Sequence, residues 1–117
     1  MENPKFISVI IPVYNEERYI DGCVQSMLEQ DYPKESMEWI FVDGMSKDAT
    51  KRILTEYQSR YPALIRVLDN PDKTVPYAMN AGIRAAKGAY IIRLDAHAEY
   101  AQDYFSKCVE LLERTGA

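Results

Sequence analysis

The sequence is poor in several residue types and patterns, and each shortage narrows what the chain can be. Its 117 residues include two cysteines, one histidine and one tryptophan. Cys23 and Cys108 each lie in an apolar helical pattern, which favours buried reduced thiols over a disulfide. No apolar run approaches the roughly 18 residues that a membrane span requires, and the start shows no signal-peptide pattern. We therefore expect a soluble, cytoplasmic protein, whose longer parent could sit at the cytoplasmic face of a membrane.

Two glycine-rich nucleotide motifs are also missing. The sequence contains neither G-x-G-x-x-G after its first apolar run nor G-x-x-x-x-G-K-[ST], so the dinucleotide fingerprint and the phosphate loop are both absent. The formal net charge of -4 argues against a nucleic-acid partner. A polyanionic ligand would therefore need a cation or the amino ends of helices to balance its charge.

The size and composition of the chain suit one globular domain. Apolar residues make up 47% and charged residues 27%, which is ordinary for a soluble protein of this length. Four short apolar runs predict strands, and each is followed by a segment with apolar residues at helical spacing. The predicted strands cover residues 6–11, 39–42, 64–68 and 89–94, and the apolar helical stripes cover residues 20–28, 53–61, 79–86 and 104–112.

This alternation predicts the fold class. A strand followed by a helix, four times over, indicates α/β architecture with right-handed crossovers between parallel strands. We expect a Rossmann-like open parallel sheet of about four strands with helices on both faces.

Polar residues predict where the helices begin. Asn15 and Thr74 are expected N-caps, and either Ser46 or Asp48 is expected to cap the helix between them. Side-chain oxygens at these positions would accept hydrogen bonds from the free N–H groups of the first turn.

Glycines predict turns, helix ends and close contacts. Gly44 allows a tight turn, while Gly88 and Gly116 are expected just after the ends of two helices. Gly82 lies inside a predicted helix, where glycine costs about 1 kcal/mol relative to alanine. We therefore expect close packing or a ligand beside Gly82.

Polar side chains follow three of the predicted strands. Because ligands of open parallel sheets bind beyond the carboxyl ends of the strands, we expect these side chains to meet at one edge. Each also has a plainer explanation, as a helix start, a turn residue or an ordinary surface or core histidine. The residues are Tyr14, Asn15 and Glu16 after the first strand, Asp43 after the second, and Asp95 and His97 after the fourth.

Asp95 and His97 are the candidate metal ligands. One carboxylate and one imidazole suit Mn²⁺ or Mg²⁺, and such a cation would balance a nucleotide diphosphate. This pair is therefore the predicted metal site.

These segments, taken together, resemble the family 2 inverting glycosyltransferases of the GT-A fold. The resemblance runs from about residue 6 to residue 115, in the family's order. The matching segments are SVIIPVYNE at 8–16, with the P-x-Y-N-E turn; FVDGMSKDAT at 41–50, similar to V-D-x-x-S-x-D-x-T; NAG at 80–82 with AKG at 86–88; and DAH at 95–97, in the place of D-x-D.

The resemblance implies a nucleotide-sugar donor, usually a UDP-sugar, and roles for five residues. Pro12, Tyr14 and Glu16 would line the base and ribose pocket. Asp43 would accept a hydrogen bond from N3–H of the base, and Asp95 would face the ribose and the metal.

The metal motif departs from the usual one. His97 takes the place of the second aspartate and would coordinate the metal that bridges the diphosphate. A neutral imidazole adds no negative charge, so the site should hold Mg²⁺ less well than two carboxylates would. Asp-Ala-His resembles the branch that builds bacterial exopolysaccharides such as succinoglycan, and Gly44 replaces the second of the usual paired acids.

The resemblance also implies transfer of a hexose, with inversion, to a glycan or lipid-linked acceptor. The family's acceptor site and catalytic base lie beyond the position of residue 117. We therefore expect residues 1–117 to be the nucleotide-sugar-binding part of a truncated GT-A domain, inactive alone. The fourth strand would then form an exposed sheet edge, which favours self-association.

Three other classes are weaker interpretations. A receiver domain would need clustered acids where Pro12-Val13-Tyr14 stands. A nucleotidyltransferase would show a glycine-rich basic loop after its first strand. A non-catalytic nucleotide-binding or interaction module with the same fold stays open, and only ligand-binding measurements distinguish it.

Overall fold

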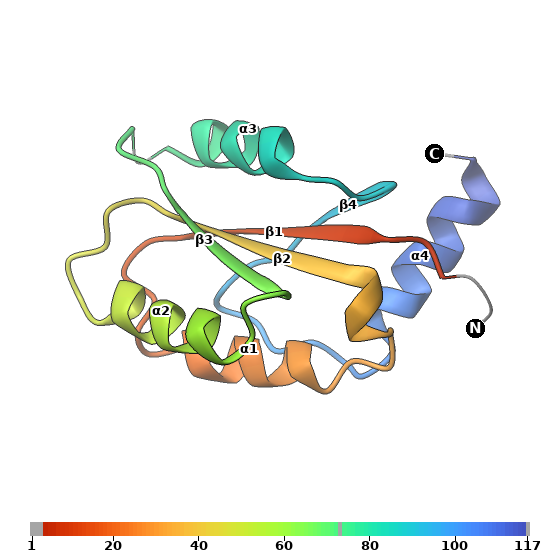
Figure 1. The fold of residues 1–117 in the computed structure, drawn as a ribbon, viewed down its shortest axis with the longest axis horizontal. Helices are drawn as coiled ribbons and strands as arrows, with labels where there is room; N and C mark the ends of the chain where they lie inside the picture. Colours follow the sequence, from red (N-terminus) through yellow and green to blue (C-terminus); the bar gives the residue numbers. More distant parts are fainter. Residues whose placement is uncertain (1–3, 73, 117) are drawn as a thin grey trace.

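The chain folds into a four-stranded parallel sheet with helices on both faces, in a computed structural model that describes residues 4–72 and 74–116 (Figure 1). The strand order is β3-β2-β1-β4, and every neighbouring pair is parallel. This confirms the predicted α/β fold. The elements are β1 (Ile7–Val13), α1 (Ile20–Leu28), a short 3₁₀ helix η1 (Lys34–Ser36), β2 (Met37–Asp43), α2 (Thr50–Arg60), β3 (Ile65–Asp69), α3 (Val75–Ala85), β4 (Tyr90–Arg93) and α4 (Tyr104–Thr115).

The central strands β1 and β2 are buried on both faces, which explains why their sequences are nearly continuous apolar runs. Val9 and Ile11 of β1 pack into the core beneath α1, α2 and α4. Ile10 points to the other face and packs with Val42 and with Ala78 of α3. Figure 1 shows α3 alone on that face, with α1 and α2 on the opposite one.

Two glycines permit close approach between the elements that flank the sheet. A Cβ atom at Gly82 of α3 would lie 2.6 Å from Ile10 Cγ2, which confirms the expected close packing. Gly88 is not the residue after a helix, because α3 ends at Ala85. A Cβ atom at Gly88 would instead lie 2.6 Å from the backbone nitrogen of Ser8, so a side chain there would push the entry of β4 away from β1.

The helix starts differ from the sequence prediction, whereas the last helix end agrees with it. Asn15 is not an N-cap: α1 begins at Ile20, and Asn15 has a left-handed backbone with φ of 51°. Thr74 lies at the N-cap of α3, but its hydroxyl donates to Asp72 and makes no cap hydrogen bond. Gly116, with φ of 71°, ends α4 as expected. Within the described ranges, no helix has the length and apolar character needed to cross a membrane.

Strand β4 forms one edge of the sheet, and among the described residues it pairs only with β1. Ile91 of this edge is 42% exposed. We predict concentration-dependent self-association through β4, measurable as a rising mass in light scattering. Ile91→Lys should reduce it, because a charge on an edge strand opposes pairing. A monomeric mass for the unmodified chain at high concentration would contradict the prediction.

Candidate functional site

An open cleft of about 210 Å³ lies beyond the carboxyl ends of β1 and β4. Parallel strands bring these ends to the same edge of the sheet, as expected for a ligand site in this architecture. Residues from both ends line the cleft, and the start of α3 contributes one wall. The predicted site residues that the structure brings together there are Pro12, Tyr14, Glu16, Asp95 and His97.

Asp43 is placed differently. Its side chain is buried, with Oδ2 accepting a hydrogen bond from the Ser46 backbone (3.1 Å) and Oδ1 accepting one from the Ser46 hydroxyl (2.5 Å). The carboxylate therefore closes the turn after β2, while its neighbours Val42 and Gly44 line the cleft. The left-handed residue of this turn is Met45, with φ of 65°, rather than Gly44. Recognition of a base by Asp43 stays a prediction.

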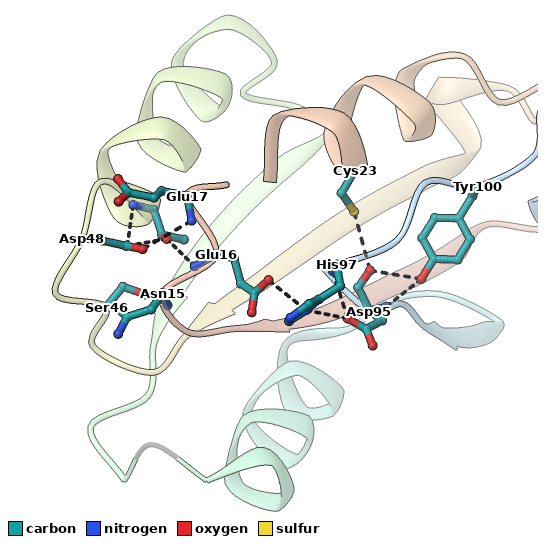
Figure 2. Close-up of polar contacts among 10 residues, drawn as sticks. Asn15, Glu16, Glu17, Cys23, Ser46, Asp48, Asp95, His97 and Tyr100 are labelled. Atoms are coloured by element: carbon teal, nitrogen blue, oxygen red, sulfur yellow. Dashed lines mark hydrogen bonds and ion pairs between the residues drawn. The ribbon is translucent and has the colours of Figure 1, made fainter. Parts of the chain in front are cut away.

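The loops after β1 and β2 hold each other through reciprocal hydrogen bonds, and we call residues 15–17 and 46–50 the loop clamp (Figure 2). The backbone N–H of Asn15 donates to Ser46 Oγ (2.9 Å), and the N–H of Lys47 donates to Asn15 Oδ1 (2.8 Å). Ser46 and Asn15 therefore join two loops rather than capping helices.

Thr50 and Asp48 extend the clamp to Glu16. The backbone N–H of Glu16 donates to Thr50 Oγ1 (2.8 Å), and that hydroxyl donates to Asp48 Oδ1 (2.5 Å). Burial acts to raise the pKa of Asp48, but hydrogen bonds from Thr50, from the Glu17 backbone and from its own backbone together outweigh it, and the net pKa is lowered. The S-x-D-x-T residues thus fix the backbone that carries Glu16 into the cleft.

His97 lies between two carboxylates at the edge of the cleft (Figure 2). Its Nδ1 is 2.9 Å from Glu16 Oε2 and 3.2 Å from Asp95 Oδ1. The ring of Tyr19 stacks on the imidazole, with centroids 5.1 Å apart and an interplanar angle of 19°. The Glu16 side chain is 11% exposed, against 71% for Asp95. One acid is therefore buried and the other faces solvent.

The backbone of Asp95 is fixed by the residues that follow it. Tyr100 Oη accepts a hydrogen bond from the Asp95 N–H (2.8 Å) and donates one to its carbonyl (3.1 Å). Asp95 Oδ1 accepts a bond from the N–H of His97 (2.9 Å). The turn from Asp95 to His97 is therefore held by the side chains of Asp95 and Tyr100.

Negative charge is concentrated at this corner of the cleft. Burial raises the pKa of Glu16; His97 opposes the rise, and Asp95 and Asp48 add to it. Burial also raises the pKa of Cys23 to about 12, again with contributions from nearby carboxylates. No group of three or more His, Cys, Asp or Glu residues in the described part of the chain could hold a metal ion by itself. A cation here would therefore depend on oxygen atoms of a ligand or of water.

Three features of the cleft were missed from the sequence. Arg93, at the end of β4, lines the cleft, and so do Thr74 and Val75 at the amino end of α3. The amino end of a helix attracts anions through its free N–H groups. Asn70 also lines the cleft; it is buried, and its side-chain amide donates to the Thr74 carbonyl (3.0 Å). The only sequence signal for Arg93 was a charge at the end of an apolar run.

The two cysteines are free in the structure and should react at different rates. Cys23 is buried, and its raised pKa of about 12 keeps it a thiol at pH 8, whereas Cys108 is partly exposed. Since the thiolate is the reactive form, we expect iodoacetamide to modify Cys108 first and Cys23 only after unfolding. Mass spectrometry of the alkylated chain measures this, and equal labelling of both in the native protein would contradict the described burial.

Comparison with known proteins identifies a family. Residues 8–117 match the family model described as glycosyl transferase family 2. A dolichyl N-acetyl-alpha-D-glucosaminyl phosphate 3-beta-D-2,3-diacetamido-2,3-dideoxy-beta-D-glucuronosyltransferase of Methanococcus voltae is 39% identical over 110 residues, which cover 93% of this chain and 34% of the relative. Glycosyltransferase AglE of Haloferax volcanii is 34% identical, covering 95% of this chain and 36% of the relative. The chain thus spans about a third of the length of these relatives.

Solved structures agree with the sequence match. Mannosyltransferase PcManGT from Pyrobaculum calidifontis, in complex with GDP-Man and Mn²⁺, superposes with a TM-score of 0.87 at 27% identity, covering 95% of this chain and 33% of that one. GalNAc-T7, with UDP, GalNAc and Mn²⁺, gives a TM-score of 0.83 at 28% identity, covering 96% and 22%. With its parallel sheet, its flanking helices and the match over residues 8–117, the chain has the GT-A fold and belongs to glycosyl transferase family 2.

Proposed function

We propose that this chain binds a nucleoside-diphosphate sugar together with a divalent cation, as part of a protein that transfers the sugar to a glycan or lipid-linked acceptor. The main support for the proposal is the distribution of charge in the cleft. Asp95 and His97 line its negatively charged corner, and Arg93 and the amino end of α3 line other walls. A diphosphate with a bound cation matches this distribution of charge. The relatives support a nucleotide sugar as the ligand.

The donor set fits a divalent cation. Asp95 would supply a carboxylate oxygen and His97 an imidazole nitrogen, a mixture that favours Mn²⁺ over Mg²⁺. The oxygen Oε2 of Glu16 is buried beside them, 2.9 Å from His97 Nδ1 and without a hydrogen bond among the described residues, so a cation bound nearby would stabilise its charge. When bound, the cation would act as a Lewis acid that stabilises charge on the leaving diphosphate.

Other residues of the chain would bind and orient the donor. Pro12 and Tyr14 would contact the base and ribose, because they line the cleft beside the end of β1. Arg93 would pair with phosphate oxygens, to which the guanidinium offers two parallel donors. The first-turn N–H groups of α3 would add to this attraction.

Calorimetric titration with UDP and GDP, each with and without Mn²⁺, tests the proposal. We expect UDP to bind at least about tenfold more tightly with Mn²⁺ than without it, a difference of about 1.4 kcal/mol. We also expect UDP to bind more tightly than GDP. A folded chain that binds neither nucleotide would instead support a non-catalytic module. Tighter binding of GDP than of UDP would support the same binding site but indicate that the donor is a GDP-sugar.

Transfer requires groups that we place elsewhere in the parent protein. The relatives are about three times as long as the matched segment, and we propose that their remaining residues hold the acceptor and the base that removes its proton. Attack by the acceptor hydroxyl opposite the leaving diphosphate would invert the anomeric centre. The 117-residue chain should therefore bind donor without transferring sugar. Acceptor-dependent release of UDP by the purified chain would contradict this division.

A further inference from the structure

We propose that Glu16 is a positioning residue for His97. Its carboxylate accepts the Nδ1–H of the imidazole and so leaves Nε2 as the atom that faces a cation. The proposal rests on the cation site of the proposed function and adds to it the tautomer of the histidine and the residue that selects it. Metal-binding histidines commonly donate their second ring N–H to a carboxylate, which fixes the orientation of the ring.

The geometry singles out Nδ1. This atom lies within 3.2 Å of carboxylate oxygens from both Glu16 and Asp95. In the described part of the chain, no hydrogen bond or ion pair reaches Nε2. A proton on Nδ1 would face two acceptors, whereas a lone pair on Nδ1 would face two negative charges. The neutral imidazole should therefore carry its proton on Nδ1.

Burial distinguishes the two carboxylates. Glu16 is 11% exposed, whereas Asp95 is 71% exposed and is the proposed cation ligand. A charge in a poorly solvated position interacts more strongly with its neighbours than one in water. Glu16 Oε2 is also buried without a hydrogen bond among the described residues, although it lies 2.9 Å from Nδ1. Of the two carboxylates, Glu16 therefore has more to gain from the Nδ1–H.

Both partners are held in place from outside the contact. The backbone of Glu16 is tied to Thr50 through the loop clamp, and Tyr19 stacks on the face of the imidazole. Glu16 therefore approaches His97 from a fixed backbone, and Tyr19 covers one face of the imidazole ring. Such a pair is suited to presenting one nitrogen in a constant direction.

The chain offers a direct test, because His97 is its single histidine. In protein labelled with ¹⁵N-histidine, nitrogen chemical shifts show which ring nitrogen carries the proton. In the neutral form of the imidazole we expect the unmodified chain to show a protonated Nδ1 and an unprotonated Nε2. A neutral imidazole that carries its proton on Nε2 would overturn the proposal, and this measurement does not depend on any variant folding.

Glu16→Ala tests the role of the carboxylate, since the backbone bond to Thr50 is retained in this variant. We expect a mixture of tautomers and an affinity for Mn²⁺ that is about 10–100-fold weaker, the usual loss when such a partner is removed. Glu99→Ala is the matched control, because Glu99, like Glu16 and Asp95, contributes to the raised pKa of Cys23 but pairs with neither nitrogen of His97. It should keep the Nδ1–H tautomer and lose less than about fivefold in affinity.

The outcomes separate this proposal from the proposed function. If Glu16→Ala and Glu99→Ala give the same tautomer and the same affinity, Glu16 acts only through its charge and the positioning role is wrong. If the unmodified chain has the Nδ1–H tautomer and Glu16→Ala loses it, yet Mn²⁺ and UDP do not bind, the positioning role stands and the proposed function fails.

Discussion

Replacing Asp95 with asparagine should weaken binding of Mn²⁺ by at least about 100-fold, and so remove the gain in UDP affinity that Mn²⁺ provides, while leaving the fold intact. Losing a residue that only orients a metal ligand costs about 10–100-fold, and Asp95 is the proposed ligand itself. Asparagine keeps the shape of the side chain and an oxygen that can accept the N–H of His97, which Asp95 Oδ1 accepts at 2.9 Å. The turn should therefore survive, and only the negative charge is lost. Calorimetric titration of UDP in the presence of Mn²⁺ measures the effect.

Asp103→Asn is the control for this experiment. It removes the same charge from the surface, where Asp103 pairs with Lys107 at 3.1 Å and is 44% exposed. We expect no change in nucleotide affinity and at most a few tenths of a kcal/mol in stability. If Asp95→Asn retains full Mn²⁺-dependent affinity, other residues hold the cation. The proposed metal site would then be wrong, and so would the proposal that the charges of the cleft match a diphosphate with its cation.

Replacing Glu38 with alanine should lower the free energy of unfolding by about 1–3 kcal/mol or more, because buried hydrogen-bond donors lose their acceptor. Glu38 is 5% exposed and lies in β2. Its Oε2 accepts hydrogen bonds from the Ser8 hydroxyl and the Lys87 backbone, both at 2.6 Å. Its Oε1 lies 3.6 Å from Arg66. Alanine would leave these donors without an acceptor, and a buried unsatisfied group costs about 1–3 kcal/mol.

Urea unfolding followed by circular dichroism measures this loss, with Glu56→Ala as the control. Glu56 pairs with Arg52 one helical turn away at 3.1 Å, and both side chains are more than half exposed. Such a pair contributes about 0.3–0.5 kcal/mol, so the two glutamates should differ by several-fold. Similar losses for both variants would show that the network around Glu38 is hydrated and contributes little.

The fold could be predicted from the sequence because its signals are local and consistent. Apolar runs such as Trp39–Val42 are too short for helices, and the structure buries them on both faces of the sheet. Each predicted strand is followed by a predicted helix, and this strict alternation is compatible with few topologies. Since parallel strands end at one edge, the meeting of Glu16, Asp95 and His97 also followed from the sequence.

The details of the site depended on contacts between residues distant in sequence. Asn15 looks like an N-cap, but its partners Ser46 and Lys47 lie more than thirty positions away. Asp43 accepts two hydrogen bonds from Ser46, and it is not among the residues that line the cleft. Arg93 carries no pattern that distinguishes it from a surface arginine. Side-chain direction at the end of a strand is decided by three-dimensional packing, which residue order alone does not specify.

The loop clamp has a consequence for engineering donor preference. The loop after β1 and the loop after β2 each supply donors and acceptors to the other, as in the bond from the Ala49 N–H to Glu17 Oε2 at 3.2 Å. A chimaera that imports one loop from a relative would leave its former partner with unmatched polar groups. The two loops therefore behave as one exchangeable cassette, and recombination that moves residues 14–19 and 44–50 together should yield folded hybrids more often than recombination that separates them.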